Sequence, residues 1–127
     1  MIKRILVIDD DEAIRKVFLL AVEGTGFQVD TAESGAKGIQ MTKEEIYDLI
    51  YLDLKMPGMN GVETLRELRS IHPDIPVYII TAHYGEFADE LRTAQKDGLA
   101  FELMKKPLTM TQIVTLTKGI LEGTTIY

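Results

Sequence analysis

The fold of this chain is decided by the stretch Leu49-Ile50-Tyr51-Leu52-Asp53-Leu54-Lys55-Met56-Pro57-Gly58-Met59-Asn60-Gly61. Four consecutive apolar residues are followed by a carboxylate, and the segment after it is rich in Pro and Gly. A short apolar run bounded by turn residues is typical of a strand buried on both faces. Asp53 is therefore expected where a buried strand opens into a loop, the place where open α/β sheets bind their ligands.

Similar apolar runs alternate with stretches of helical periodicity along the rest of the chain. Such alternation predicts parallel strands with helices on both faces, and right-handed crossovers then give a doubly wound, three-layer (βα)5 sandwich of the α/β class. We expect one domain over residues 1–122 and a loose tail over 123–127. The expected strands are 5–8, 27–32, 49–52, 76–80 and 101–104, and the helical stripes run through 14–22, 36–43, 62–71, 87–94 and 113–120.

Composition limits what such a domain does. The chain has 127 residues, 20 acidic and 14 basic side chains and a formal net charge of −6. An acidic chain without a basic stripe is a poor candidate for direct binding to nucleic acid. It has no cysteine, which excludes thiol catalysis and disulfides and fits the cytoplasm. No apolar stretch approaches the ~20 residues of a membrane span, so we expect no association with a membrane.

Polar side chains follow four of the five expected strands. Asp9 and Asp10 follow the first, Asp53 the third and Thr81 the fourth, and a lysine precedes Pro107 after the fifth. Because parallel strands end at one edge of a sheet, these groups are expected to converge. Converging carboxylates repel one another, and Mg²⁺ relieves that repulsion with oxygen ligands of this kind. A lysine and a hydroxyl beside the cation form a pocket for a tetrahedral anion, most simply a phosphoryl group.

These segments together resemble the receiver domain of two-component response regulators. The resemblance covers essentially the whole chain and implies a flavodoxin-like sheet with strand order 2-1-3-4-5. The matching pieces are Ile5-Leu6-Val7-Ile8-Asp9-Asp10, Leu52 to Gly61, Ile80-Thr81-Ala82 and Lys106-Pro107.

The resemblance implies a role for each acidic residue. Asp53 would be the phosphoacceptor, which attacks a phosphohistidine and becomes an acyl phosphate. Asp10, Asp53 and the backbone carbonyl of Lys55 would bind Mg²⁺ directly, and Asp9 would help directly or through water. The side chains of Lys55 and His83, two residues beyond Asp53 and Thr81, would flank the phosphoryl group and modulate its loss.

The resemblance also implies a phosphoryl-binding switch. Lys106 would pair with the phosphoryl oxygens, and Lys105 is the fallback because adjacent strand residues face opposite sides. The Thr81 hydroxyl would turn inward, with Ala82 beside it, and Pro107 would follow a cis peptide. The aromatic residue that the family places three residues before the lysine is replaced here by Leu103, unless Phe101 takes its place.

As a receiver, this chain would be a phosphoacceptor signalling domain that promotes only its own phosphorylation and dephosphorylation. Its partners would be a sensor histidine kinase or a histidine phosphotransfer protein, and a downstream protein or output domain. The signal would leave from the fourth helix, fifth strand and fifth helix, roughly residues 84–120, of a stand-alone regulator or of a receiver within a longer one.

Two other functions compete with the receiver interpretation. A haloacid-dehalogenase-like Mg²⁺-dependent phosphatase also uses an aspartate at a strand end, but it needs a second aspartate two residues later, where this chain has Lys55. A flavodoxin needs a phosphate loop rich in Ser and Thr after the first strand, where this chain has Asp9-Asp10-Asp11-Glu12.

Overall fold

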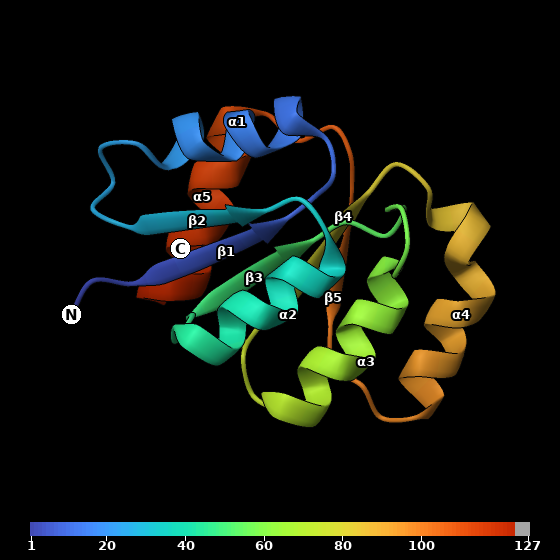
Figure 1. The fold of residues 1–127 in the computed structure, drawn as a ribbon. Coiled ribbons are helices and arrows are strands. Elements are labelled where there is room, and N and C mark those ends of the chain that lie inside the picture. The colour runs from blue at the N-terminus through green and yellow to red at the C-terminus, as the bar shows by residue number, and fades with distance from the viewer. Residues whose placement is uncertain (124–127) are drawn as a thin grey trace.

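The protein is described by a computed structural model, and the structure is described for residues 1–123. Apart from Gly123, the predicted tail at 123–127 lies outside these described residues. Strands and helices alternate along the described chain (Figure 1). The strands are β1 Arg4–Ile8, β2 Gln28–Ala32, β3 Leu49–Leu52, β4 Val77–Thr81 and β5 Glu102–Lys105, and the helices are α1 Glu12–Val22, α2 Gly35–Glu44, α3 Gly61–Ile71, α4 Tyr84–Lys96 and α5 Met110–Glu122.

The five strands described form one sheet in the order β2-β1-β3-β4-β5, and every neighbouring pair is parallel. The predicted class, topology and strand order are therefore confirmed. Helices α1 and α5 cover one face of this sheet, and α2, α3 and α4 cover the other (Figure 1). In the register of the central strands, Ile8 lies beside Leu52, so the residues that follow β1 and β3 emerge next to each other.

The apolar runs of β1 and β3 are buried because successive side chains supply two different cores. Leu6 and Leu52 belong to the core under α2, α3 and α4, whereas Ile5 and Tyr51 belong to the core under α1 and α5. These four side chains are at most 1% exposed. A strand covered on both faces needs no polar alternation, which is why its first polar side chain marks its end.

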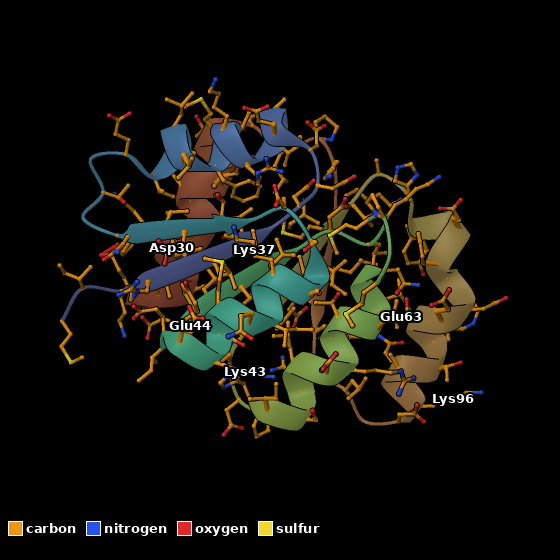
Figure 2. The ribbon with its side chains drawn as sticks, in the orientation of Figure 1. Asp30, Lys37, Lys43, Glu44, Glu63 and Lys96 are labelled. Carbon is orange, nitrogen blue, oxygen red and sulfur yellow. The ribbon has the colours of Figure 1, made fainter. Side chains whose placement is uncertain are left out.

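Helix starts are set by local hydrogen bonds that the sequence encodes. The Asn60 side chain accepts from the Glu63 backbone N–H and the Glu63 carboxylate accepts from Asn60, a capping box that begins α3. The predicted capping box of Thr109 and Gln112 begins α5 in the same way. Glu63 lies near the start of α3 in Figure 2, and exposed charged side chains such as Lys37 project from α2.

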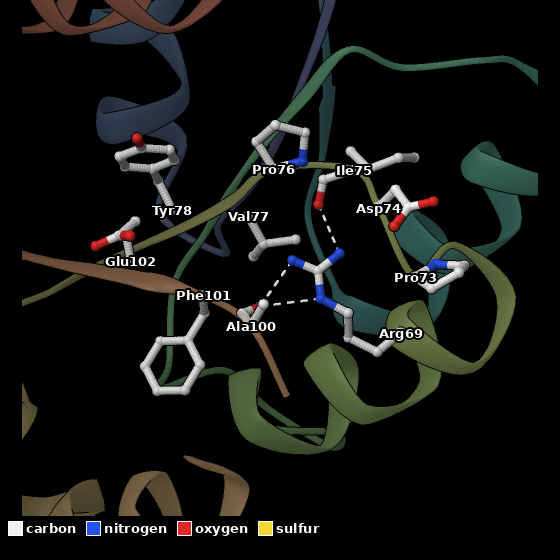
Figure 3. Close-up of a pocket in the computed structure, with 10 residues that line it drawn as sticks. All are labelled: Arg69, Pro73, Asp74, Ile75, Pro76, Val77, Tyr78, Ala100, Phe101 and Glu102. Carbon is white, nitrogen blue, oxygen red and sulfur yellow. Dashed lines mark hydrogen bonds between the residues drawn. The ribbon is translucent and has the colours of Figure 1, made fainter. Parts of the chain in front are cut away.

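At the edge of the sheet opposite Asp9, Asp10 and Asp53, the Arg69 side chain joins α3 to the loops before β4 and β5. Its guanidinium donates to the carbonyl oxygens of Ala100 (2.7 Å from Nη2) and Ile75 (2.6 Å from Nη1), as Figure 3 shows. Pairing of β5 with β4 starts at Glu102, opposite Tyr78. The strand therefore starts one residue after the predicted start at Phe101.

A helix that crosses a bilayer must be both long and apolar. Within residues 1–123, no helix is both long enough and apolar enough to cross a bilayer.

Candidate functional site

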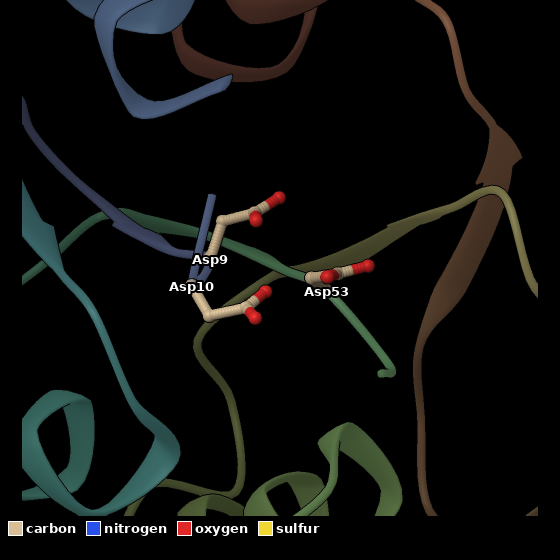
Figure 4. Close-up of side chains that lie close together, drawn as sticks. All are labelled: Asp9, Asp10 and Asp53. Carbon is tan, nitrogen blue, oxygen red and sulfur yellow. The ribbon is translucent and has the colours of Figure 1, made fainter. Parts of the chain in front are cut away.

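Three carboxylates meet where β1 and β3 end. Oxygen atoms of Asp9, Asp10 and Asp53 lie within 4.8 Å of one another, and Figure 4 shows the three side chains on neighbouring chain segments. Backbone hydrogen bonds extend the sheet to this point: the Asp53 N–H donates to Ile8 (2.9 Å) and the Asp9 N–H to Ala32 (3.0 Å). The sheet therefore fixes the backbone of both aspartates.

Burial differs among the three acids. Asp9 and Asp53 are 3% and 5% exposed, whereas Asp10 is exposed to solvent. Asp9 Oδ1 accepts from the Asp11 backbone N–H at 2.9 Å, and the Asp9 backbone carbonyl accepts from the Arg15 guanidinium at 2.8 Å. The Arg15 contact escaped sequence reasoning, although an arginine one helical turn into α1 is within reach of the end of β1.

Lys106 supplies the positive charge beside these carboxylates. Its ammonium donates to Asp9 Oδ2 at 2.8 Å and lies 3.3 Å from Asp53 Oδ1. The Lys106 backbone N–H donates to the Thr81 carbonyl at 2.9 Å, so β4 orients the residue. Lys105, one residue earlier, is exposed. The pleat thus aims Lys106 at the acids, and the peptide between Lys106 and Pro107 is cis.

Asp53 is the electrostatically strained member of this site. Burial raises the pKa of Asp53 to about 6 from 3.8, and the Asp9 carboxylate adds to the rise, while Lys106 opposes it. Burial also works against the charge of Lys106, but its hydrogen bond to Asp9 and the two carboxylates outweigh burial and raise the pKa of Lys106. Asp53 Oδ1 is buried and has no hydrogen-bond partner among the described residues.

The β4–α4 loop forms the next part of the rim. Thr81 is fully buried, and its hydroxyl oxygen accepts a hydrogen bond from the His83 backbone N–H at 2.8 Å. Ala82 and His83 are exposed. A cavity of about 300 Å³ separates this loop from the end of β5. Its lining residues are Thr81, Ala82, Tyr84, Gly85, Lys105 and Lys106.

The two predicted positions for an aromatic residue on the fifth strand lie away from this cavity lining. Leu103 and Phe101 are both partly buried and pack against the core under α2, α3 and α4. Phe101 precedes β5, and Leu103 pairs with Ile79 within it. Both side chains therefore contribute to the packing of α4 against the sheet.

Lys55 and Gly61 bound the loop that follows Asp53. The Lys55 ammonium is paired with Glu86 in α4 at 3.3 Å, a contact that no sequence pattern signals. Gly61 packs directly on the Asp53 backbone, where an added Cβ would lie 2.3 Å from the Asp53 carbonyl oxygen. A glycine directly after the N-cap Asn60 was the only sequence signal of this close approach.

Comparisons with known proteins agree with this geometry. Residues 5–118 match the family model described as the response regulator receiver domain. The transcriptional regulatory protein ZraR of Klebsiella oxytoca is 33% identical over 117 residues, which are 91% of this chain and 26% of that protein. The chain thus spans about a quarter of that curated relative.

Two solved structures share both fold and sequence with the chain. A response regulator receiver domain protein from Clostridium thermocellum is 31% identical with a TM-score of 0.80, and the match covers 96% of each chain. The response regulator protein TrrA of Thermotoga maritima, solved in complex with Mg²⁺ and BeF, is 30% identical with a TM-score of 0.78, covering 94% of this chain and all of that one. The chain belongs to the response regulator receiver domain family.

Proposed function

We propose that Asp53 accepts a phosphoryl group from a phosphohistidine of a sensor histidine kinase or histidine phosphotransfer protein, in a step that requires Mg²⁺. The observation that carries this proposal is the buried Asp53 oxygen, which lacks a hydrogen-bond partner within residues 1–123 and faces Lys106 beside two further carboxylates. Because the match covers a receiver domain, the proposal concerns that domain and not a whole regulator.

The donor set fits Mg²⁺. Carboxylate and carbonyl oxygens are its preferred protein ligands, and Asp10, Asp53 and the Lys55 backbone carbonyl would hold it, with Asp9 directly or through water. When bound, the cation neutralises charge on the transferring phosphoryl group. TrrA, one of the similar structures, was solved with Mg²⁺ and BeF, which supports the same ion here.

The remaining residues position and stabilise the phosphoryl group. An Asp53 carboxylate oxygen attacks phosphorus, and the bond from phosphorus to the histidine nitrogen breaks. Lys106 offers its ammonium to the phosphoryl oxygens from its place between Asp9 and Asp53. The Thr81 hydroxyl, which now accepts from His83, would rotate to donate to the phosphoryl group. That rotation releases the β4–α4 loop and so changes the face made by α4, β5 and α5.

That face would deliver the signal to a downstream protein or to an output domain. We propose a cytoplasmic domain with no reaction beyond its own phosphorylation and dephosphorylation, and the net charge of −6 disfavours direct binding to nucleic acid. The haloacid-dehalogenase-like alternative is not favoured, because Lys55 occupies the position of the general acid that such a phosphatase needs.

Phosphoryl acceptance is tested by incubating the protein with Mg²⁺ and acetyl phosphate. We expect a mass gain of one phosphoryl group that requires the metal and is released by alkali, as an acyl phosphate is. Asp53→Ala should abolish the gain, whereas Asp74→Ala, an exposed carboxylate at the opposite edge of the sheet, should leave it unchanged. Absence of the gain in the wild type, or its survival in Asp53→Ala, contradicts the proposal.

The affinity for Mg²⁺ distinguishes Lys106 from Lys105 as the lysine of the site. Lys106→Met removes a positive charge 3.3 Å from Asp53 Oδ1, so we expect Mg²⁺ to bind roughly three to tenfold more tightly, the range that a charge contact of this kind supports. Lys105→Met, its matched control on the exposed side of β5, should leave affinity unchanged. Titration calorimetry measures both, and a stronger effect of Lys105→Met would assign the site to that lysine instead.

A further inference from the structure

An ion pair crosses the rim of the site between the loop after Asp53 and the start of α4. The Lys55 ammonium lies 3.3 Å from Glu86 Oε1, and the two side chains are 55% and 52% exposed. Lys55 follows Asp53 by two residues, which places their Cα atoms no more than about 7.6 Å apart. The same ammonium is thus held by Glu86 and within reach of a group attached to Asp53.

Such an exposed pair is weak. Water and salt screen the attraction between the two ions, and ordering two long side chains costs entropy. A phosphoryl group on Asp53 carries about −1.5 to −2 charges, whereas the Glu86 carboxylate carries a single negative charge. The phosphoryl group also sits beside Asp9 and Asp53, which are nearly fully buried. The Lys55 ammonium therefore gains more from the phosphoryl group than it loses by leaving Glu86.

We propose that Lys55 exchanges Glu86 for the phosphoryl group on Asp53, and that Glu86, by competing for Lys55, shortens the lifetime of the acyl phosphate. This inference rests on the proposed phosphoryl acceptance by Asp53. It makes Glu86 a positioning residue, because its carboxylate contacts the Lys55 ammonium and acts on the phosphoryl group only through that side chain.

The step that Glu86 controls is hydrolysis. A water oxygen bonds to phosphorus while the bond from phosphorus to the Asp53 oxygen breaks, the water gives up a proton to solvent, and the products are inorganic phosphate and the Asp53 carboxylate. An ammonium lying over the phosphoryl oxygens blocks the approach of that water. While the Lys55 ammonium is paired with Glu86, water can approach the phosphorus atom.

The exchange also loosens α4 at one end. Lys55–Glu86 joins the first turn of α4 to the loop after Asp53, while Arg66 and Asp97 form a second ion pair at the far end of the helix, at 2.7 Å. Transfer of Lys55 to the phosphoryl group releases the first contact and keeps the second. The start of α4, beside the Thr81 loop, is then the part free to move.

The test compares decay rates of the acyl phosphate after removal of acetyl phosphate. Glu86→Gln should slow decay roughly two- to fivefold, the range that corresponds to an exposed ion pair. Glu90→Gln is the matched control, because Glu90 lies one turn later in α4, contacts Asn60 and loses the same charge; it should decay like the wild type. Lys55→Asn should decay faster, and Lys55→Arg should restore the wild-type rate.

The double variant that combines Lys55→Asn with Glu86→Gln tests whether Glu86 acts through Lys55. In the Lys55→Asn background, Glu86→Gln should change nothing, because no ammonium is left to release. A second readout needs no turnover: with Mg²⁺ and beryllofluoride as the phosphoryl stand-in, the side-chain carboxyl ¹³C signal of Glu86 should shift in the wild type and stay constant in Lys55→Asn.

The outcomes distinguish this inference from the function on which it rests. Equal decay of Glu86→Gln and wild type, equal slowing by Glu90→Gln, or slowing that persists without Lys55 each overturns the exchange and leaves phosphoryl acceptance intact. If no variant forms an acyl phosphate at all, phosphoryl acceptance fails and the exchange fails with it.

Discussion

Asp53→Asn is expected to raise the free energy of unfolding by about 1 to 3 kcal/mol at pH 7.5 in the absence of Mg²⁺. Asp53 is 5% exposed, and its pKa is raised from 3.8 to about 6. Since one pKa unit corresponds to about 1.4 kcal/mol, ionising this side chain in the folded protein costs about 3 kcal/mol. The amide carries no charge and avoids this cost, which already includes the opposing attraction of Lys106 and is therefore the upper limit of the gain.

The gain should depend on pH in a defined direction. Because the pKa of Asp53 is higher in the folded than in the unfolded chain, the folded state binds the proton more tightly between about pH 4 and pH 6. The wild type therefore loses stability as pH rises through this window, and the Asn variant does not. The difference between the two proteins should be small near pH 4 and complete above pH 7.

Urea unfolding of the wild type and of Asp53→Asn at pH 4 and at pH 7.5, with a chelator present, measures this difference in stability. Asp74→Asn serves as the control because Asp74 is exposed, and a surface substitution of this kind changes stability by less than about 0.5 kcal/mol. A gain of the same size at pH 4 and pH 7.5 would contradict a titrating origin. Added Mg²⁺ should narrow the gap at pH 7.5, because the cation stabilises the wild-type carboxylates.

The fold was predictable because each element carries its own local signal. Leu49 to Leu52 are four consecutive apolar residues followed by Asp53. This pattern is typical of a strand that is buried on both faces, as these four residues are. Thr109 with Gln112 marks the start of α5. Alternation of strands and helices then leaves few topologies, and the strand order came from the family resemblance rather than from the residues.

The choice between Lys105 and Lys106 was not decidable from the pleat alone. Alternation says that only one of two adjacent residues faces the site, but which one depends on the register with β4. In that register Thr81 pairs with Lys105, and the backbone N–H of the next residue, Lys106, donates to the Thr81 carbonyl oxygen. The functional role of Lys106 stays a prediction, whereas its position beside Asp9 is a property of the structure.

Contacts between distant residues escaped prediction for a different reason. Lys55 and Glu86 are 31 residues apart, and the buried hydroxyls of Tyr51 and Thr117, which share a 2.7 Å hydrogen bond, are 66 apart. No periodicity or spacing encodes such pairs, because they arise only when α4 and α5 have settled on the sheet. Through these two contacts the loop after Asp53 reaches α4, and β3 reaches α5.

Gly61→Ala is expected to lower the free energy of unfolding by about 1 to 3 kcal/mol, the usual cost of overpacking. Gly61 is the first residue of α3, and its N–H donates to the Leu54 carbonyl at 2.8 Å. A Cβ there would lie 2.3 Å from the Asp53 carbonyl oxygen and 2.7 Å from Leu54 Cα. These are backbone atoms, so no side-chain rotation relieves the clash, and the loop itself must shift.

Because the displaced atoms belong to Asp53, the substitution should also weaken the site. A shift of the carboxylate by a fraction of an ångström is expected to cost tenfold or more in the rate of phosphorylation, since such reactions depend steeply on position. Acetyl phosphate kinetics measure the rate, and urea unfolding measures the stability.

Gly119→Ala is the matched control for Gly61→Ala. It lies inside α5, nothing stands within 4 Å of its added Cβ, and alanine should raise the free energy of unfolding by up to about 1 kcal/mol through helix propensity. Opposite signs for the same substitution would separate the need for space at residue 61 from a general intolerance of methyl groups. A Gly61→Ala protein as stable and as readily phosphorylated as the wild type would mean that α3 moves away from Asp53 at little cost, and the position of the phosphoacceptor would then depend on the β1–β3 hydrogen bond between Asp53 and Ile8 rather than on α3.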